Sequence, residues 1–206
     1  EGGRVNRLNK LIEASIFTAE FFGNLYKKNK KKFFNYYKIY INQISYLLNE
    51  IGANINTVPV LDVRREKSSN VIGDRSYSSL PKNVSKIGDV CIKEFKKRGI
   101  GTVIKHIPGH GLAKVDSHRL APVVKKKMKY LYKNDFAPFK NKKTFFAMTA
   151  HVIYKDIDPI NTATHSPKII KLIRKEIGFK NIIISDDISM KGLKYSIKQN
   201  IQKALS

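Results

Sequence analysis

The sequence is poor in cysteine and tryptophan, and it has no long hydrophobic run. Its 206 residues include one Cys and no Trp, so Cys91 has no partner within the chain and no intramolecular disulfide can form. A lone thiol gives no sign of an oxidising compartment, and we therefore expect a reduced, cytoplasmic protein. No stretch approaches the roughly 18 apolar residues that a membrane span requires, so the sequence predicts no membrane span.

Glycine and proline are also too scarce for a fibrous or low-complexity chain. The sequence has 12 Gly, 7 Pro and 42% hydrophobic residues, which is ordinary for a globular protein. A chain of this length can bury a sizeable core. Collagen-like and disordered classes are thereby excluded.

Acidic residues are few, and this shortage gives the chain its strongest bias. There are 16 Asp and Glu against 40 Lys and Arg, for a net charge of +24, which usually indicates a polyanionic partner. Arg stands at only eight positions, so 32 of the cations are Lys, which lacks the forked donors that nucleic-acid readers favour. Lysine runs at 27–32 and 125–129 are more simply interpreted as solvated helix faces or loops, the first as an exposed insertion. We predict no specific nucleic-acid partner, while polyanion binding stays open as an alternative.

Two kinds of apolar pattern alternate along the chain. Three segments carry apolar side chains at intervals of three and four residues, which predicts helices: 40–51, 84–95 and 166–177. Four others are short, nearly continuous apolar runs, which predicts buried strands: 56–62, 100–104, 144–150 and 181–184. Alternating strands and helices favour a parallel α/β architecture.

Polar and titratable residues follow all four predicted strands. A (β/α)8 barrel of the TIM type builds its active site from the loops after its strands, and an open doubly wound sheet also binds ligands there. We favour the barrel. Four strand–helix units cannot close eight strands, and a complete barrel typically needs about 250 residues. We therefore expect residues 1–206 to form an incomplete barrel domain, only its central units, from a chain that begins before Glu1.

The loop after the second predicted strand gathers three of the five His residues. It reads Lys105-His-Ile-Pro-Gly-His-Gly111 and continues to Asp116-Ser-His118. Proline and glycine predict a shaped turn. A carboxylate beside an imidazole fixes its tautomer and stabilises its cation, so Asp116 and His118 could form a general acid/base pair. The alternative is a polar surface loop with a capping Asp.

Two adjacent carboxylates, Asp186 and Asp187, follow the last predicted strand. A carboxylate that leaves an apolar strand at the rim of an α/β site suits a nucleophile or a metal ligand. The structural alternative is an N-cap for a helix that begins after Ser189. Because successive strand residues point to opposite faces, only one of the two can point toward the barrel axis.

Several motifs in register resemble the β-N-acetylhexosaminidases of glycoside hydrolase family 3, the NagZ type that recycles cell-wall muropeptides. The matching segments span essentially the whole chain: 1–5, 59–62, 72–76, 105–111, 116–118, 150–154 and 184–190. The resemblance implies that residues 1–206 are an incomplete catalytic barrel domain of this family. It implies a retaining glycosidase that releases terminal β-linked N-acetylglucosamine from muropeptides in peptidoglycan recycling.

The resemblance also assigns roles to individual residues. Asp186 would be the nucleophile that forms a covalent glycosyl intermediate, His118 the acid/base and Asp116 its partner. The sugar-binding positions fall on a further set: Arg7, Arg75, Lys105 and His106. No cofactor and no metal are implied. We expect a monomer whose partner is the muropeptide substrate.

Other readings of the same residues remain open. His106, His110, Asp116 and His118 are ligand types that suit zinc, which would make a metal-dependent hydrolase, although their spacing fits no standard signature. A catalytically inactive basic fragment is a further alternative.

Four side chains carry simpler expectations. Arg75 has a surface ion pair with Asp74 as its alternative role. We expect His110 to order the turn, His151 to be a satisfied histidine at the rim, and His165 to be exposed to solvent.

Overall fold

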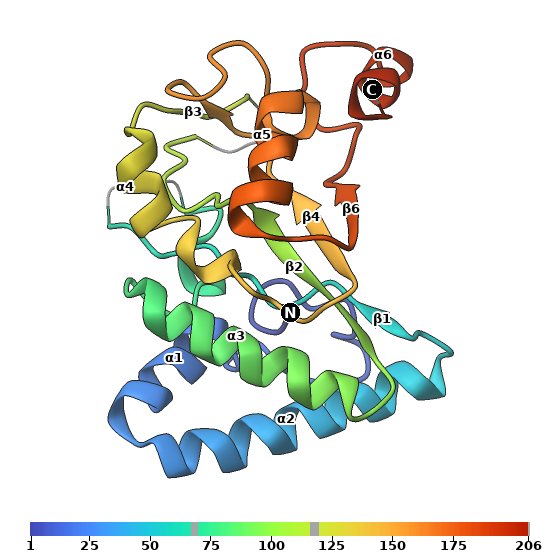
Figure 1. Ribbon diagram of the computed structural model, residues 1–206. Helices are drawn as coiled ribbons and strands as arrows, with labels where there is room; N and C mark the ends of the chain where they lie inside the picture. The colour runs from blue at the N-terminus through green and yellow to red at the C-terminus, as the bar shows by residue number, and fades with distance from the viewer. Residues whose placement is uncertain (67–69, 116–119, 206) are drawn as a thin grey trace.

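A computed structural model describes residues 1–66, 70–115 and 120–205. Two helices open the fold, α1 (Ala19–Lys28) and α2 (Lys30–Glu50). The main strands and connecting helices then alternate (Figure 1): β1 (Ile55–Asn56), α3 (Pro81–Lys96), β2 (Gly101–Ile107), α4 (Met128–Lys133), β4 (Phe146–Thr149), α5 (Pro167–Leu172), β6 (Ile182–Ser185) and α6 (Ile197–Leu205). Short pieces complete the list: β3 (Val123–Val124), β5 (Ile153–Tyr154) and the 3-10 turns Gly73–Arg75, Ala137–Phe139 and Ala163–His165.

The four main strands form one parallel sheet whose spatial order follows the chain, β1-β2-β4-β6. Representative registers pair Ile55 with Gly101, Val103 with Phe146, and Phe146 with Ile182. A doubly wound sheet reverses its strand order at a switch point, and this sheet does not. The order is that of consecutive strands in a (β/α)8 barrel, so the predicted partial TIM-type α/β architecture is confirmed.

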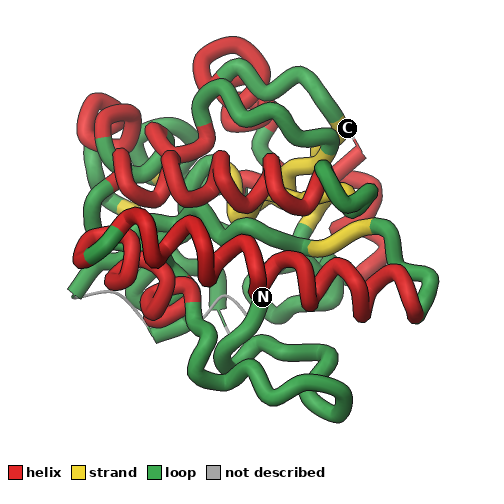
Figure 2. The backbone as a smooth tube through the Cα atoms, turned by 90° about the horizontal axis from the view of Figure 1, so that it is seen from below, coloured by secondary structure: helices red, strands yellow, loops and turns green. Residues whose placement is uncertain are grey.

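The core lies between this sheet and the helices that cover it. Helix α3 buries one face, including Val84, Ile87, Cys91 and Phe95, which confirms the helix that the spacing predicts at 84–95. Helices α2 and α3 pack side by side, as the view from below shows (Figure 2). Because both faces of β2 are covered, its residues after Gly101 are buried without alternation.

The first predicted helix is longer than the apolar spacing indicated. Helix α2 begins at Lys30, where the Asn29 side chain accepts a hydrogen bond from the main-chain N–H of Lys32. Such a cap satisfies one of the free N–H groups at a helix start. Residues 27–32 are therefore the end of α1 and the first turn of α2, and all of them are exposed, which confirms the solvated helix face expected there.

The predicted strand at 56–62 is also shortened. Strand β1 ends at Asn56, three residues before Pro59, which has no N–H to offer a ladder. Beyond it the chain stays beside β2 through an isolated bridge between Val60 and Lys105 and a 2.7 Å hydrogen bond from Leu61 N to the Lys105 carbonyl. The segment thus still delivers Asp62 to the carboxyl end of the sheet.

The remaining predicted elements are confirmed, with shifted ends. Strands β2, β4 and β6 occupy the runs at 100–104, 144–150 and 181–184. The Ser166 side chain caps α5 by accepting from Ile169 N. The last turn of the predicted helix widens to a π-helix at Ile173–Ile177, and Gly178 ends it with a φ of 82°.

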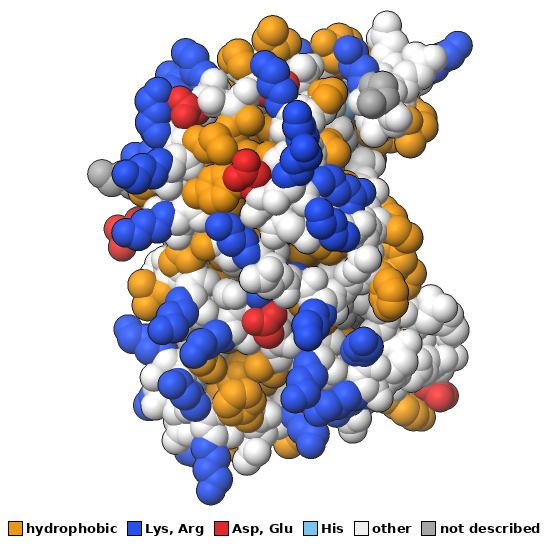
Figure 3. Space-filling model, in the orientation of Figure 1, with side chains coloured by type: hydrophobic (Ala, Val, Ile, Leu, Met, Phe, Trp, Pro, Cys, Tyr) orange, Lys and Arg blue, Asp and Glu red, His pale blue; other side chains and the backbone are white. Residues whose placement is uncertain are grey.

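On the one face that Figure 3 shows, basic side chains are spread out and do not gather in one band. On the face shown in Figure 3, Lys and Arg appear over nearly every element, between apolar and neutral patches. Such a distribution fits solvated side chains better than a built polyanion groove. Of the helices in the described ranges, none combines the length and hydrophobicity that crossing a membrane would take.

Candidate active site

A cavity of about 570 Å³ lies at the carboxyl end of the sheet. One wall is apolar, formed by side chains of α2 and α3 that include Tyr40, Ile44 and Phe95. The other wall is polar and holds five of the predicted site residues: Arg7, Arg75, Lys105, His106 and Asp186. Two further predicted residues, Asp116 and His118, lie outside the described residues.

Asp186 enters this cavity from the end of β6. Its side chain is one-quarter exposed, and its Oδ2 lies 3.8 Å from Nε2 of His106, which belongs to β2. The neighbouring carboxylate points elsewhere, since Asp187 Oδ1 accepts hydrogen bonds from the N–H and the hydroxyl of Ser189. Strand alternation therefore separates the two as expected. The structural alternative, an N-cap for a helix after Ser189, is wrong, because the next helix begins only at Ile197.

His106 is held from behind by a buried carboxylate. Its Nδ1 lies 2.6 Å from Asp62 Oδ2, and its main-chain N–H also points to the same carboxylate, at 3.3 Å from each oxygen. Burial of Asp62 opposes its ionisation, but the charge of His106 and its hydrogen bond outweigh burial, so the pKa of the Asp62 carboxyl is lowered. Asp62 is therefore an anion, and Nε2 is the ring nitrogen of His106 that faces Asp186.

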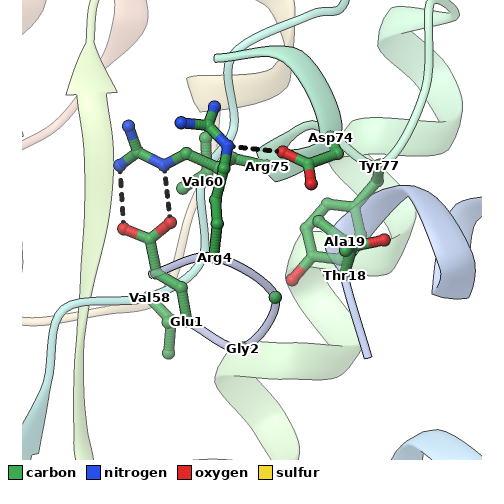
Figure 4. A pocket seen from close by; sticks show the side chains of 11 residues that line it. Glu1, Gly2, Arg4, Thr18, Ala19, Val58, Val60, Asp74, Arg75 and Tyr77 are labelled. Atoms are coloured by element: carbon green, nitrogen blue, oxygen red, sulfur yellow. Dashed lines mark hydrogen bonds and ion pairs between the residues drawn. The ribbon is translucent and has the colours of Figure 1, made fainter. Parts of the chain in front are cut away.

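Glu1 organises the cationic side of the cavity, and its ion pair with Arg75 is drawn in Figure 4, a close view of a second pocket that shares Glu1 and Arg75 with the cavity. Arg75 donates from Nε to Oε2 at 2.7 Å and from Nη2 to Oε1 at 2.8 Å, a two-bond ion pair, and the Lys105 ammonium contacts the same carboxylate. Asp74 instead pairs with Arg4, at 2.8 Å. The alternative that placed Arg75 in an ion pair with Asp74 is therefore wrong.

The charges in this cluster stabilise one another. Burial of Glu1 opposes its ionisation, yet hydrogen bonding from Arg75 and the charge of Lys105 hold the pKa of the Glu1 carboxyl well below its usual range. Burial of Arg75 opposes its charge, and the bond to Glu1 outweighs burial, so the pKa of Arg75 is raised. Arg75 and Lys105 are thus oriented cations before any ligand enters.

His151 steadies the turn that carries Asp186. Its Nε2 donates to the main-chain carbonyl of Asp187 at 3.0 Å, and its Nδ1 lies 2.7 Å from the Thr164 hydroxyl, which is the donor. Burial lowers the pKa of His151, and the bond to the carbonyl opposes this only in part. The expectation of a satisfied rim histidine is confirmed. His165, by contrast, is buried beside the Tyr195 ring, so the expectation of solvent exposure is wrong.

The loop after β2 is shaped by contacts with Asp62 and Tyr154. The main-chain N–H of His110 donates to Asp62 Oδ1 at 2.6 Å, and the Tyr154 hydroxyl donates to the carbonyl of Gly109 at 2.5 Å. Burial lowers the pKa of His110 to about 4, so its ring is neutral near pH 7. The expected role of His110 in ordering the turn is confirmed.

In the part of the chain that the structure describes, the side chains do not form the metal site that the zinc alternative requires. No cluster of three or more His, Cys, Asp or Glu side chains is arranged there to hold a metal ion. His106, one of the proposed ligands, already gives its Nδ1 to Asp62. Asp116 and His118, two others, lie outside the described residues.

The family resemblance singled out five residues that line the cavity, and two further residues that organise its polar wall were missed. Glu1 and Asp62 were seen only as parts of matching motifs, although both carboxylates organise the polar wall. The available signal for Asp62 was its position, a carboxylate at the end of a short apolar run. No comparable signal marked Glu1, because its partners come from distant segments.

Comparison with known proteins defines the class of this site. The family model described as the Glycosyl hydrolase family 3 N terminal domain matches residues 1–206. The chain therefore belongs to glycosyl hydrolase family 3, as the motifs predicted.

Individual relatives share the same assignment. Beta-hexosaminidase A of Pseudoalteromonas piscicida is 33% identical over 214 residues, which cover 94% of this chain and 34% of that protein. Beta-hexosaminidase of Idiomarina loihiensis is 36% identical over 144 residues, or 69% of this chain and 43% of that protein. The chain spans less than half the length of these two relatives.

Solved structures agree with the fold and with the family. NagZ from Neisseria gonorrhoeae superimposes with a TM-score of 0.81 at 27% identity, covering 91% of this chain and 55% of that one. A glycoside hydrolase family 3 beta-N-acetylglucosaminidase from a Paenibacillus species gives a TM-score of 0.75 at 30% identity, covering 79% and 32%.

Proposed function

We propose that this protein is a retaining β-N-acetylhexosaminidase that releases terminal β-linked N-acetylglucosamine from muropeptides. One observation carries the proposal: Arg7, Arg75, Lys105, His106 and Asp186 line a single cavity. Family membership and the hexosaminidases among the relatives support the choice of sugar. The muropeptide substrate, a role in peptidoglycan recycling, a cytoplasmic location and a monomeric state belong to the same proposal.

In the first step of the proposed reaction, an Asp186 carboxylate oxygen attacks the anomeric carbon as the bond to the leaving oxygen breaks. His118, supported by Asp116, gives its proton to that oxygen. In the second step His118 takes a proton from water, the resulting hydroxide attacks the same carbon, and the glycosyl–Asp186 bond breaks. Two inversions leave the released sugar with its original β configuration.

The cationic wall has the complementary role of holding the sugar. A neutral pyranose offers hydroxyl oxygens, and the side chains of Arg75 and Lys105 are donors that Glu1 has already oriented. Because these donors are already held in place, less side-chain conformational entropy is lost when the sugar binds. Arg7 lies at the same cavity, and its assignment to the sugar rests on the family resemblance.

The direct test is hydrolysis of 4-nitrophenyl N-acetyl-β-D-glucosaminide by the natural-length protein. We expect release of nitrophenol, release of the β anomer first in a proton NMR time course, and unchanged rates after dialysis against a chelator. Absence of release from this substrate and from muropeptides would refute the proposal. Initial release of the α anomer would refute the retaining step, and loss of activity to the chelator would favour the zinc alternative.

A further inference from the structure

We propose that Asp62 is a positioning residue that keeps a hydrogen on Nδ1 of His106, so that Nε2 alone faces the sugar. The inference deepens the proposed function and rests on it for its consequences in catalysis. Its structural half, the protonation pattern of the ring, can be measured without any activity.

The hydrogen bonds around Asp62 define the pattern. The carboxylate is completely buried, and in the described part of the chain its hydrogen bonds come from three nitrogens: His106 N, His106 Nδ1 and His110 N. Because an ionised carboxylate only accepts, the nitrogen 2.6 Å away must carry the hydrogen. The two main-chain N–H groups fix both oxygens in place, so the carboxylate cannot turn away from the ring.

The hydrogen on Nδ1 determines which hydrogen bonds Nε2, on the cavity side of the ring, can form. In the neutral ring, hydrogen on Nδ1 leaves a lone pair on Nε2, which can accept a hydrogen bond from a sugar hydroxyl. At 3.8 Å, Nε2 is too far from Asp186 Oδ2 for a direct hydrogen bond. The opposite tautomer would aim an Nε2–H at Asp186 and lower its nucleophilicity.

In the part of the chain that the structure describes, the neighbouring groups do not give His106 a second carboxylate partner like Asp62. The His110 ring lies with its centroid 5.6 Å away, and burial keeps it neutral. The Lys105 ammonium and the Arg75 guanidinium face Glu1. Among the residues that the structure describes, Asp62 and Asp186 are therefore the two carboxylates that act on the ring, one behind it and one across the cavity.

An Asn at position 62 should reverse the tautomer. Its amide has one acceptor oxygen and one donor NH2 group. The main-chain N–H of His110 is fixed 2.6 Å from Oδ1 and can only donate, so the amide oxygen must take the position of Oδ1. The NH2 group then falls where Oδ2 stands and must donate to Nδ1, which forces the hydrogen of the neutral ring onto Nε2. A comparable carboxylate-to-amide change in the Ser-His-Asp triad acts by the same route.

The experiment is a long-range proton–nitrogen NMR spectrum of the histidine rings in the 15N-labelled protein, with His106 assigned by its loss in His106→Gln. With the ring neutral, we expect the Nδ1–H pattern in the wild type and the Nε2–H pattern in Asp62→Asn. Asp135→Asn, a buried carboxylate paired with Arg65, is the matched control and should keep the wild-type pattern. An Nε2–H ring in the wild type would overturn the proposal even if Asp62→Asn failed to fold, as would an unchanged ring in a folded Asp62→Asn.

Kinetics then separate positioning from mere support of the fold. We expect Asp62→Asn to lower kcat/KM by about 10- to 100-fold, and to cause no further loss in a His106→Gln background. Losses that multiply in the double variant would show that Asp62 acts through something other than His106. If the wild type hydrolyses no N-acetylglucosaminide, the proposed function fails while the NMR result still decides the tautomer.

Discussion

Arg75 and Glu1 form a two-bond ion pair, with N–O distances of 2.7 and 2.8 Å, that joins the start of the chain to the turn before α3. Both side chains are largely buried, at 12% and 8% exposure. A planar guanidinium matches the two oxygens of a carboxylate, and Nη1 donates a third hydrogen bond to the Val71 carbonyl at 3.2 Å, which leaves one N–H on each terminal nitrogen for a ligand. The pair therefore fixes the shape of the cationic wall before substrate binding.

Replacing Arg75 with Lys tests this geometry at constant charge. A lysine can make only one of the two bonds and offers no fork, so the substitution is not conservative here. We expect kcat/KM for an N-acetylglucosaminide to fall by about 10- to 100-fold, mainly through KM if Arg75 binds substrate and transition state equally. Steady-state kinetics of the two proteins measure it.

Arg98→Lys is the matched control for that substitution. Arg98 also pairs with a carboxylate, Glu94 of α3 at 3.1 Å, but it lies in the turn after that helix and outside the cavity lining. We expect its kcat/KM to stay within about twofold of the wild type. Equal losses in the two variants would mean that Arg75 serves the fold and not the sugar.

Removing the proposed nucleophile should abolish turnover. Asp186→Ala takes away the carboxylate that would form the glycosyl intermediate, and we expect kcat to fall at least about 1,000-fold. Added azide can enter the vacated space and attack the anomeric carbon in a single inversion. The expected product is therefore α-glycosyl azide, detectable by NMR with an activated aryl glycoside.

The adjacent carboxylate supplies the control. Asp187→Asn keeps an acceptor oxygen for the Ser189 contacts and leaves Asp186 unchanged. We expect it to retain far more activity than Asp186→Ala. If Asp187→Asn were less active than Asp186→Ala, the assignment of Asp186 as the nucleophile would be wrong.

Repetitive local patterns predicted most of the fold. The spacing of Val84, Ile87, Cys91 and Phe95 is a property of one helix face, and the structure buries that face. The start of α2 was missed because its first turn is lysine-rich and is defined by the Asn29 cap rather than by apolar spacing. Local chemistry thus located the four main strands and helices α2, α3 and α5, but not α1, α4 or α6, and the ends of the located elements depended on caps and on Pro59.

Contacts between distant segments could not be predicted in the same way. Strand-end placement did point to Asp186 and to His106, because carboxyl ends of parallel strands meet at one edge. The position of Asp62 behind His106 depends on a chain path beside β2 that no periodicity records. His165 was misjudged because its burial comes from Tyr195, which lies in a later segment.

Asp135 should make the stability of the protein depend on pH. Burial raises the pKa of Asp135 to about 6, against 3.8 ordinarily, and the charge of Arg65 offsets this only in part. The folded state then binds the proton more tightly than the unfolded state. The protonated Asp135 therefore stabilises the folded state, and this stabilisation is fully present below about pH 4. It is lost as the pH rises through 6, so the free energy of unfolding falls by about 2 kcal/mol between pH 4 and 7.

Asp135→Asn removes that titration. We expect the unfolding free energy of the wild type relative to the variant to decrease by about 2 kcal/mol between pH 4 and 7. Urea unfolding at several pH values measures the difference, and groups common to both proteins that do not interact with Asp135 cancel in it. A difference that does not change with pH would show that Asp135 is not protonated preferentially in the folded state.

Gly111 closes the loop after β2 against the segment that carries Asp62. A Cβ atom at position 111 would lie 2.1 Å from the main-chain carbonyl oxygen of Val63, so either the loop or that segment would have to move. We expect Gly111→Ala to lower the unfolding free energy by about 3 kcal/mol and to reduce activity, since His106 and Asp62 stand on the two segments that are forced apart. In Gly101→Ala, the new methyl would meet its nearest atoms at 3.5 Å, an ordinary contact, so this control should change stability by less than about 1 kcal/mol. Similar urea midpoints for the two variants would show that the loop does not pack on Val63 as described.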